Sequence, residues 1–214
     1  MSAGCTRPNL ATGKTRVKLC GMTRVEDIVA VNEARPDFIG FVVDVPGSRR
    51  SVSCHEFEQL SALVEPGIGR VGVFVDEPVE VIARLYEARI LDYVQLHGRE
   101  DEEYIMRLRQ LCPVGIMKAF VVRSAEDVER AQRSTANLVL LDNGRGTGQA
   151  FDWTLVRQLR RPFFLAGGLG PHNVAQAIAD VRPWGVDMST GLETDGRKDA
   201  DKIRAAVAAV RREG

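Results

Sequence analysis

The sequence has few cysteines, no long apolar run and no excess of charge of either sign. Its four cysteines show no C-x-x-C spacing, and their scatter over 214 residues does not resemble a disulfide framework, so we expect a reducing cytoplasm. No run of about 18 apolar residues predicts a membrane span. Positive and negative residues balance at 29 each and are dispersed, so no basic stripe indicates nucleic acid or an anionic membrane as a partner. Any anionic ligand must therefore be bound locally.

The first 15 residues are polar, are interrupted by glycine and proline, and lack the apolar core of a secretory signal. We expect a flexible tail over residues 1–15 and one domain over residues 16–214. With 44% hydrophobic and 27% charged residues, the composition is that of an ordinary globular protein. The length suits one large domain and lies near the short end of the range for a (β/α)₈ barrel, for which about 250 residues is typical.

From residue 17 onward, short apolar runs alternate with charged segments whose apolar residues lie three or four positions apart, a pattern typical of βα units. Eight strands are predicted to begin near Val17, Phe38, Arg70, Tyr93, Gly115, Leu138, Phe163 and Gly185. Helical spacing is found in residues 25–34, 79–87, 102–111, 125–133 and 200–210. An open doubly wound sheet is the alternative, but six strands would suffice for it. The nearly uniform repeat favours a single-domain α/β fold, the closed (β/α)₈ TIM barrel.

Two glycine-containing strand ends follow one another near the end of the chain. They consist of Gly167, Gly168 and Leu169 after one strand and of Ser189, Thr190 and Gly191 after the next. Glycine lets the backbone approach a ligand closely, and free N–H groups at a turn favour an anion. The last two βα units of a (β/α)₈ barrel commonly bind phosphate. We therefore predict a phosphate monoester site here, with two ordinary tight turns as the structural alternative, and we expect a helix to open at Pro171.

Two further candidates come from polar residues at the carboxyl ends of strands. Strand alternation places Lys18 and Cys20 on one face and Leu19 on the other, so packing Leu19 against the helices turns both polar groups into the barrel. Asp142 ends a later strand and faces the same way as Leu140. A small buried cysteine and an Asp-Asn-Gly turn are the structural alternatives.

Residues after three other strands complete the candidate set. Arg49 and Arg50 lie in a loop over residues 44–53, on the side where barrels bind ligands, although exposed arginines are usually solvated surface. His97 ends the fourth strand and suits either a ligand contact or a hydrogen-bonded structural role. We interpret residues 144–148 as a mobile loop over the mouth of the barrel.

These motifs, in their order along the chain, resemble the phosphoribosylanthranilate isomerase family. The resemblance is carried by KLCGMT at 18–23, GFV at 40–42, SRR at 48–50, VGVFV at 71–75, VQLHG at 94–98, LLD at 140–142, GTG at 146–148, FDW at 151–153, GGL at 167–169 and VD at 186–187 with Ser189. It implies a (β/α)₈ barrel that performs an Amadori rearrangement in tryptophan biosynthesis. The substrate would be a phosphosugar, N-(5-phosphoribosyl)anthranilate, and neither a cofactor nor a metal would be needed.

The resemblance also assigns roles to the candidate residues. It implies that Cys20 is the base, that Asp142 is the acid, and that Arg50 binds the substrate carboxylate, while the two glycine loops bind phosphate. Thr190 stands where the family usually has a second serine, and Met22 replaces a typical isoleucine. An aspartic acid is ordinarily stronger than a thiol by about 4–5 pKa units, so the proton would ordinarily lie on the sulfur rather than on the carboxyl group. We expect the inward-facing Lys18 to oppose this by favouring the thiolate.

Two alternatives are retained. A related phosphosugar barrel, such as indole-glycerol-phosphate synthase or the histidine-pathway isomerase, would share the phosphate loops, but the latter would favour two aspartates where this chain has Cys20 and Asp142. A barrel without catalytic activity could instead sense a phosphosugar. The sequence leaves the oligomeric state open.

Overall fold

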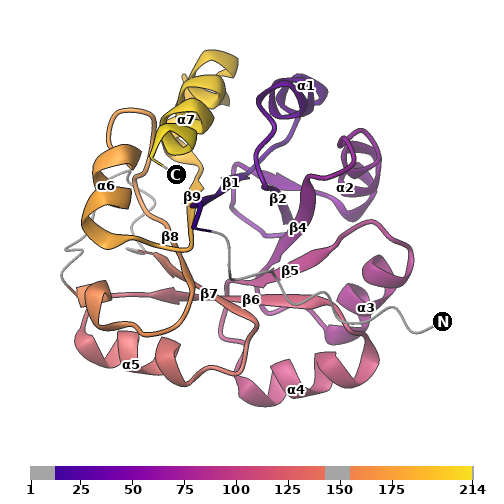
Figure 1. Cartoon of the computed structure of the whole chain (residues 1–214). Helices are drawn as coiled ribbons and strands as arrows, with labels where there is room; N and C mark the ends of the chain where they lie inside the picture. Colours follow the sequence, from indigo (N-terminus) through magenta and orange to yellow (C-terminus); the bar gives the residue numbers. More distant parts are fainter. Residues whose placement is uncertain (1–12, 143–154, 214) are drawn as a thin grey trace.

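Eight parallel strands form a closed barrel (Figure 1). The computed structural model describes residues 13–142 and 155–213. The barrel strands are β1 (Arg16–Cys20), β2 (Phe38–Val43), β4 (Gly69–Phe74), β5 (Tyr93–Leu96), β6 (Gly115–Val121), β7 (Leu138–Asp142), β8 (Phe163–Leu165) and β9 (Gly185–Met188). Their order is β1-β9-β8-β7-β6-β5-β4-β2, and pairing of β1 with β2 closes the ring. The predicted TIM barrel is confirmed, and every strand begins within one residue of its predicted start.

Helices surround the ring of strands (Figure 1). They are α1 (Val25–Ala34), α2 (Cys54–Ser61), α3 (Val79–Glu87), α4 (Glu102–Leu111), α5 (Ala125–Arg133), η1 (Leu155–Gln158, a 3₁₀ helix), α6 (Val174–Val181) and α7 (Ala200–Arg212). Four of the predicted helices have the predicted bounds, and α7 ends two residues beyond its predicted end. None of the helices among the described residues is both long and apolar enough to cross a membrane.

The long interval after β2 contains structure that the sequence interpretation missed. A two-residue strand, β3 (Ser51–Val52), pairs in parallel with β2, and α2 follows it directly. The Ser53 side chain accepts a hydrogen bond from the Glu56 backbone N–H, while the Glu56 carboxylate accepts one from the Ser53 N–H. This capping box is a start signal that the sequence carries. The predicted loop over residues 44–53 is therefore shorter than expected.

The expected start of the helix after β8 is wrong. Pro171 lies in a turn, and α6 begins three residues later at Val174. The Asn173 side chain explains the delay, because it accepts a hydrogen bond from the Gly170 N–H and donates one to the Gly168 carbonyl oxygen, at 2.8 and 2.9 Å. These bonds hold the glycine turn open ahead of the helix.

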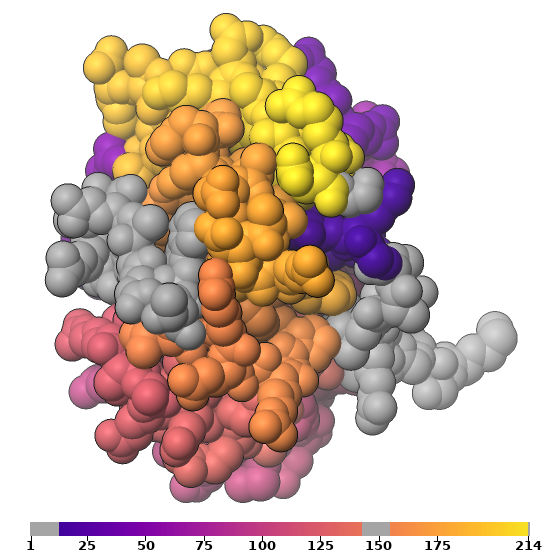
Figure 2. All heavy atoms as spheres, turned by 60° about the vertical axis from the view of Figure 1, so that its left-hand side comes forward, coloured from indigo at the N-terminus to yellow at the C-terminus, as the bar shows by residue number. Residues whose placement is uncertain are grey.

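The two ends of the described chain meet where the barrel closes. In β1 and β9, Leu19 lies opposite Met188, and α7 contacts both α1 and β1. Figure 2 shows the indigo segment at the start of the described chain beside the yellow helix α7. Strand β1 thus has its two neighbours from opposite ends of the sequence.

The apolar core forms two separate clusters. The larger cluster fills the space between strands and helices and includes Leu19, as expected. The smaller one lies inside the barrel and includes Phe38, Leu138, Leu140 and Phe164, with Tyr93 and Trp184 packed against it. The inward-facing chain of Lys18 is fully buried. Apolar side chains therefore occupy much of the barrel interior, and the polar groups gather near the carboxyl ends of the strands.

Candidate active site

A cavity of about 270 Å³ opens at the carboxyl ends of the strands and collects most of the predicted site residues. Its lining includes Cys20, Arg50, His97, Asp142, Gly167, Gly168, Ser189 and Thr190. The Leu169 side chain is instead buried in the core between the strands and the helices, so only its backbone is available to a ligand. The structure thus brings together residues that come from six strand ends.

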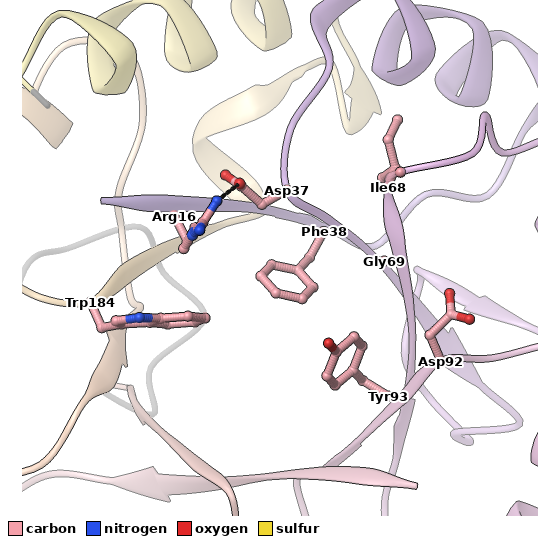
Figure 3. A pocket seen from close by; sticks show the side chains of 9 residues that line it. Arg16, Asp37, Phe38, Ile68, Gly69, Asp92, Tyr93 and Trp184 are labelled. Carbon is pink, nitrogen blue, oxygen red and sulfur yellow. Dashed lines mark hydrogen bonds and ion pairs between the residues drawn. The ribbon is translucent and has the colours of Figure 1, made fainter. Parts of the chain in front are cut away.

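A second cavity of about 430 Å³ lies at the opposite, amino-terminal end of the barrel (Figure 3). The rings of Phe38, Tyr93 and Trp184 face it, and Figure 3 shows the ion pair between Arg16 and Asp37 at its edge. This cavity is larger, but it contains none of the predicted site residues. Polar groups that converge on a site, rather than volume, identify the smaller cavity as the candidate active site.

The two glycine loops lie side by side and leave their backbone amides without hydrogen bonds to described residues. Gly167 and Gly168 have positive φ angles of 93° and 71°. No backbone N–H of residues 167–169 or 189–191 donates a hydrogen bond to any described residue. The loops also touch, because a Cβ placed on Gly191 would lie inside the contact distance of the Leu169 carbonyl oxygen and 2.9 Å from the Gly170 Cα. Six unpaired amides are therefore available to bind an anion.

Cys20 lies beside a buried ion pair. The Lys18 ammonium donates a hydrogen bond to the Asp187 carboxylate at 2.9 Å, and both side chains point into the barrel from neighbouring strands. Burial raises the pKa of the Cys20 thiol, and Asp187 raises it further, whereas the Lys18 charge lowers it. Lys18 therefore acts in the expected direction, but burial outweighs it. Cys20 is therefore held as the thiol.

Lys18 nevertheless keeps its charge at this depth. Burial alone would lower the pKa of its ammonium group, but the Asp187 carboxylate and the Cys20 sulfur raise it above the ordinary value. A fixed positive charge therefore remains next to the sulfur, where it would stabilise a thiolate once one forms.

Asp142 faces a neutral histidine. The His97 Nε2 lies 3.8 Å from the Asp142 Oδ2, and the Gln95 side-chain nitrogen lies 2.8 Å from the His97 Nδ1. Burial lowers the pKa of His97, although Asp142 opposes this shift. With the Gln95 amide nitrogen as the donor to Nδ1, the neutral ring would carry its proton on Nε2, the nitrogen that faces Asp142. The expected loop at 144–148 falls outside the described residues.

Arg50 is held by a carboxylate that the sequence interpretation did not select. Its Nε and Nη2 donate hydrogen bonds to Glu193 at 2.6 and 3.0 Å, and Nη2 also donates to the Thr190 hydroxyl at 3.1 Å. The Nη1 nitrogen has no partner within residues 13–142 and 155–213 and remains available to a ligand.

Comparisons with known proteins agree with this geometry. Residues 17–209 match the family model described as N-(5'-phosphoribosyl)anthranilate (PRA) isomerase. The N-(5'-phosphoribosyl)anthranilate isomerase of Endomicrobium trichonymphae is 39% identical over 201 residues, which are 92% of this chain and 98% of the relative. This chain belongs to that family.

Solved structures of phosphoribosylanthranilate isomerases have the same fold. The crystal structure of the Thermotoga maritima enzyme has a TM-score of 0.83 and 37% identity, covering 92% of this chain and 98% of its own. A crystal structure of a phosphoribosylanthranilate isomerase in complex with reduced 1-(o-carboxyphenylamino)-1-deoxyribulose 5-phosphate has a TM-score of 0.81 and 37% identity, with the same coverage of 92% and 98%.

Four polar residues of the site were given no role by the sequence interpretation. Asp187 and Gln95 could have been found by strand alternation, because each lies two residues from an inward-facing position on its strand. Glu193 and Lys198 have no comparable local signal, since they act through partners that lie far away in the sequence or in a hairpin that was not predicted. No group of three or more His, Cys, Asp or Glu residues within the described ranges could hold a metal ion.

Proposed function

We propose that this chain converts N-(5'-phosphoribosyl)anthranilate into 1-(2-carboxyphenylamino)-1-deoxyribulose 5-phosphate, an Amadori rearrangement in tryptophan biosynthesis. Membership of the isomerase family over residues 17–209 supports the reaction. The observation that carries the proposal is the presence, in one cavity, of a thiol, a carboxyl group and four residues of the two glycine loops, whose backbone amides donate to no described residue. The first two groups can move protons, and the loops can hold the phosphate end.

Asp142 and Cys20 would perform the two proton transfers. Asp142 gives a proton to the furanose ring oxygen, so the bond from that oxygen to C1' breaks and an iminium forms between C1' and the anthranilate nitrogen. Cys20, as the thiolate, then removes the C2' proton, and the electrons of that C–H bond neutralise the iminium to give an enolamine. Return of a proton to C1' and loss of the proton from the C2' hydroxyl give the ketone.

The resting thiol is compatible with this chemistry. The reaction needs a proton on the Asp142 carboxyl group and a thiolate at Cys20, whereas burial favours the thiol. A minor fraction of thiolate remains in equilibrium with the thiol. The fixed charge of Lys18 favours that fraction, and the His97 N–H faces the carboxyl group.

Arg50 would bind the substrate carboxylate. Its Nη1 is unoccupied by any described residue, and a guanidinium group suits a carboxylate. We also place the chain in the cytoplasm, where its free thiols at Cys20, Cys54 and Cys112 would remain reduced.

A fluorescence assay tests the proposed function. The purified chain should remove the anthranilate-type fluorescence of the substrate, and Cys20→Ala should still bind the product analogue but lose turnover. Binding of substrate by the wild-type chain without loss of fluorescence would overturn the proposal and indicate a phosphosugar sensor.

A further inference from the structure

One buried carboxylate, Glu193, joins two parts of the site that are distant in the sequence. It opens β10 (Glu193–Thr194), which pairs with β11 (Arg197–Lys198) in a hairpin directly after the second glycine loop. Only 5% of its side chain is exposed. Three cations contact it, with Arg49 at 2.5 Å, Arg50 at 2.6 Å and Lys198 at 3.0 Å.

Two of these cations also hold the glycine loop. Arg50 donates a hydrogen bond to the Thr190 hydroxyl at 3.1 Å. Lys198 donates to the Ser189 carbonyl oxygen at 2.9 Å and approaches its hydroxyl at 3.2 Å. Glu193 itself contacts neither hydroxyl, so it acts on the loop through Arg50 and Lys198.

Charge explains why this carboxylate is needed. Arg50 and Lys198 contact the same oxygen, Oε1, so two positive groups lie close together with one negative oxygen between them. Without that charge the two cations would repel each other, and a partly buried site screens such repulsion weakly. Burial alone would raise the pKa of Glu193, but hydrogen bonds from Arg50 and the Lys198 charge hold it below the ordinary value. Glu193 is therefore ionised at neutral pH.

We propose that Glu193 is a positioning residue for substrate binding, which fixes Arg50 and Lys198 against Thr190 and Ser189 so that the anion-binding loop is in place before the substrate arrives. The inference rests on the proposed function, because it explains how the phosphate-binding loop of that function is held in position. One carboxylate against three cations still leaves the site with an excess of positive charge, which suits a phosphate ester.

The variant Glu193→Gln tests the proposal, because it removes the charge and retains the size of the side chain. We expect KM to rise about ten- to a hundredfold with little change in kcat, since a misplaced binding group weakens binding on that scale. Inorganic phosphate, measured by calorimetry, should also bind more weakly. Arg50→Ala should add little to Glu193→Gln, because Arg50 is already misplaced in that background. Glu33→Gln, which removes an exposed carboxylate paired with Arg204, is the matched control and should match the wild type.

The outcomes separate this proposal from the proposed function. If the wild type isomerises the substrate and Glu193→Gln has normal KM and phosphate affinity, the positioning role is overturned while the function stands. If the wild type binds phosphate but does not isomerise, the function fails, and the phosphate arm still tests Glu193. A merely structural role would lower the thermal midpoint without changing KM. If Glu193→Gln does not fold, Lys198→Met replaces it, and normal phosphate binding in that variant would overturn the proposal.

Discussion

Gly191→Ala should separate the two glycine loops. A Cβ at this position would press on the Leu169 carbonyl oxygen and lie 2.9 Å from the Gly170 Cα, and both are backbone atoms that cannot rotate away. Relief to ordinary contact distance requires a displacement of roughly 1 Å, and a misplacement of that size costs on the order of 100-fold in rate. We therefore expect kcat/KM to fall about 100-fold, mainly through KM, together with weaker binding of inorganic phosphate.

A graded comparison tests this reasoning. In Gly170→Ala the nearest atoms to the new Cβ lie at 3.2 Å, so a shift of a few tenths of an ångström suffices and a smaller loss is expected. Gly13→Ala has no atom within 4 Å of the new Cβ and serves as the control. Steady-state kinetics and phosphate calorimetry on the three variants give the order. Normal phosphate affinity in Gly191→Ala would refute the proposed phosphate site.

Four further predictions concern the acid, the base and the buried charges. Cys20→Ser should lose nearly as much kcat as Cys20→Ala, because a hydroxyl is far harder to ionise than a thiol; retention of most of the wild-type kcat would make Cys20 a packing residue. The ring oxygen needs a proton, which the free site holds on the Cys20 thiol, and burial raises the pKa of that thiol, so the alkaline fall of kcat/KM should lie above the ordinary thiol pKa of 9.0, and a fall below pH 8 would contradict this. Arg50→Ala should chiefly raise KM. If Arg50→Ala leaves KM unchanged while Arg49→Ala raises it, Arg49 and not Arg50 binds the substrate carboxylate. Lys118→Met should lower the free energy of unfolding by about 3–5 kcal/mol in denaturant titration, because it leaves the buried Glu100 carboxylate without its ion pair, and a loss below about 1 kcal/mol would count against that pair.

The barrel could be predicted from the sequence because its elements depend on local patterns. Strands and most helices follow from alternation and helical spacing, which each segment carries by itself. The predicted start of α6 was wrong for a local reason of another kind. The Asn173 side chain forms hydrogen bonds with the glycine turn, and these outweigh the preference of proline for the first helical position. The helix α2 was missed although Ser53 and Glu56 mark its start.

The site was predictable only in part. Cys20, Asp142 and the glycine loops stand at strand ends, and the closed barrel necessarily brings such ends together. The protonation of Cys20 was not predictable in the same way, because burial and the partnership of Lys18 with Asp187 depend on packing across strands. Glu193 was missed because its partner Arg50 lies 143 positions away.

Closure of the barrel has a consequence for synthesis. A chain is made from its amino end, and β1 gains its neighbour β9 only when residues 185–188 are available. Arg50 likewise meets Glu193 only after nearly the whole sequence has been made. Contacts that span so much sequence carry a large loop-closure cost and form late. A growing chain that has already folded its first six βα units would still lack both glycine loops, so the proposed phosphate site could not form before its last strand emerged.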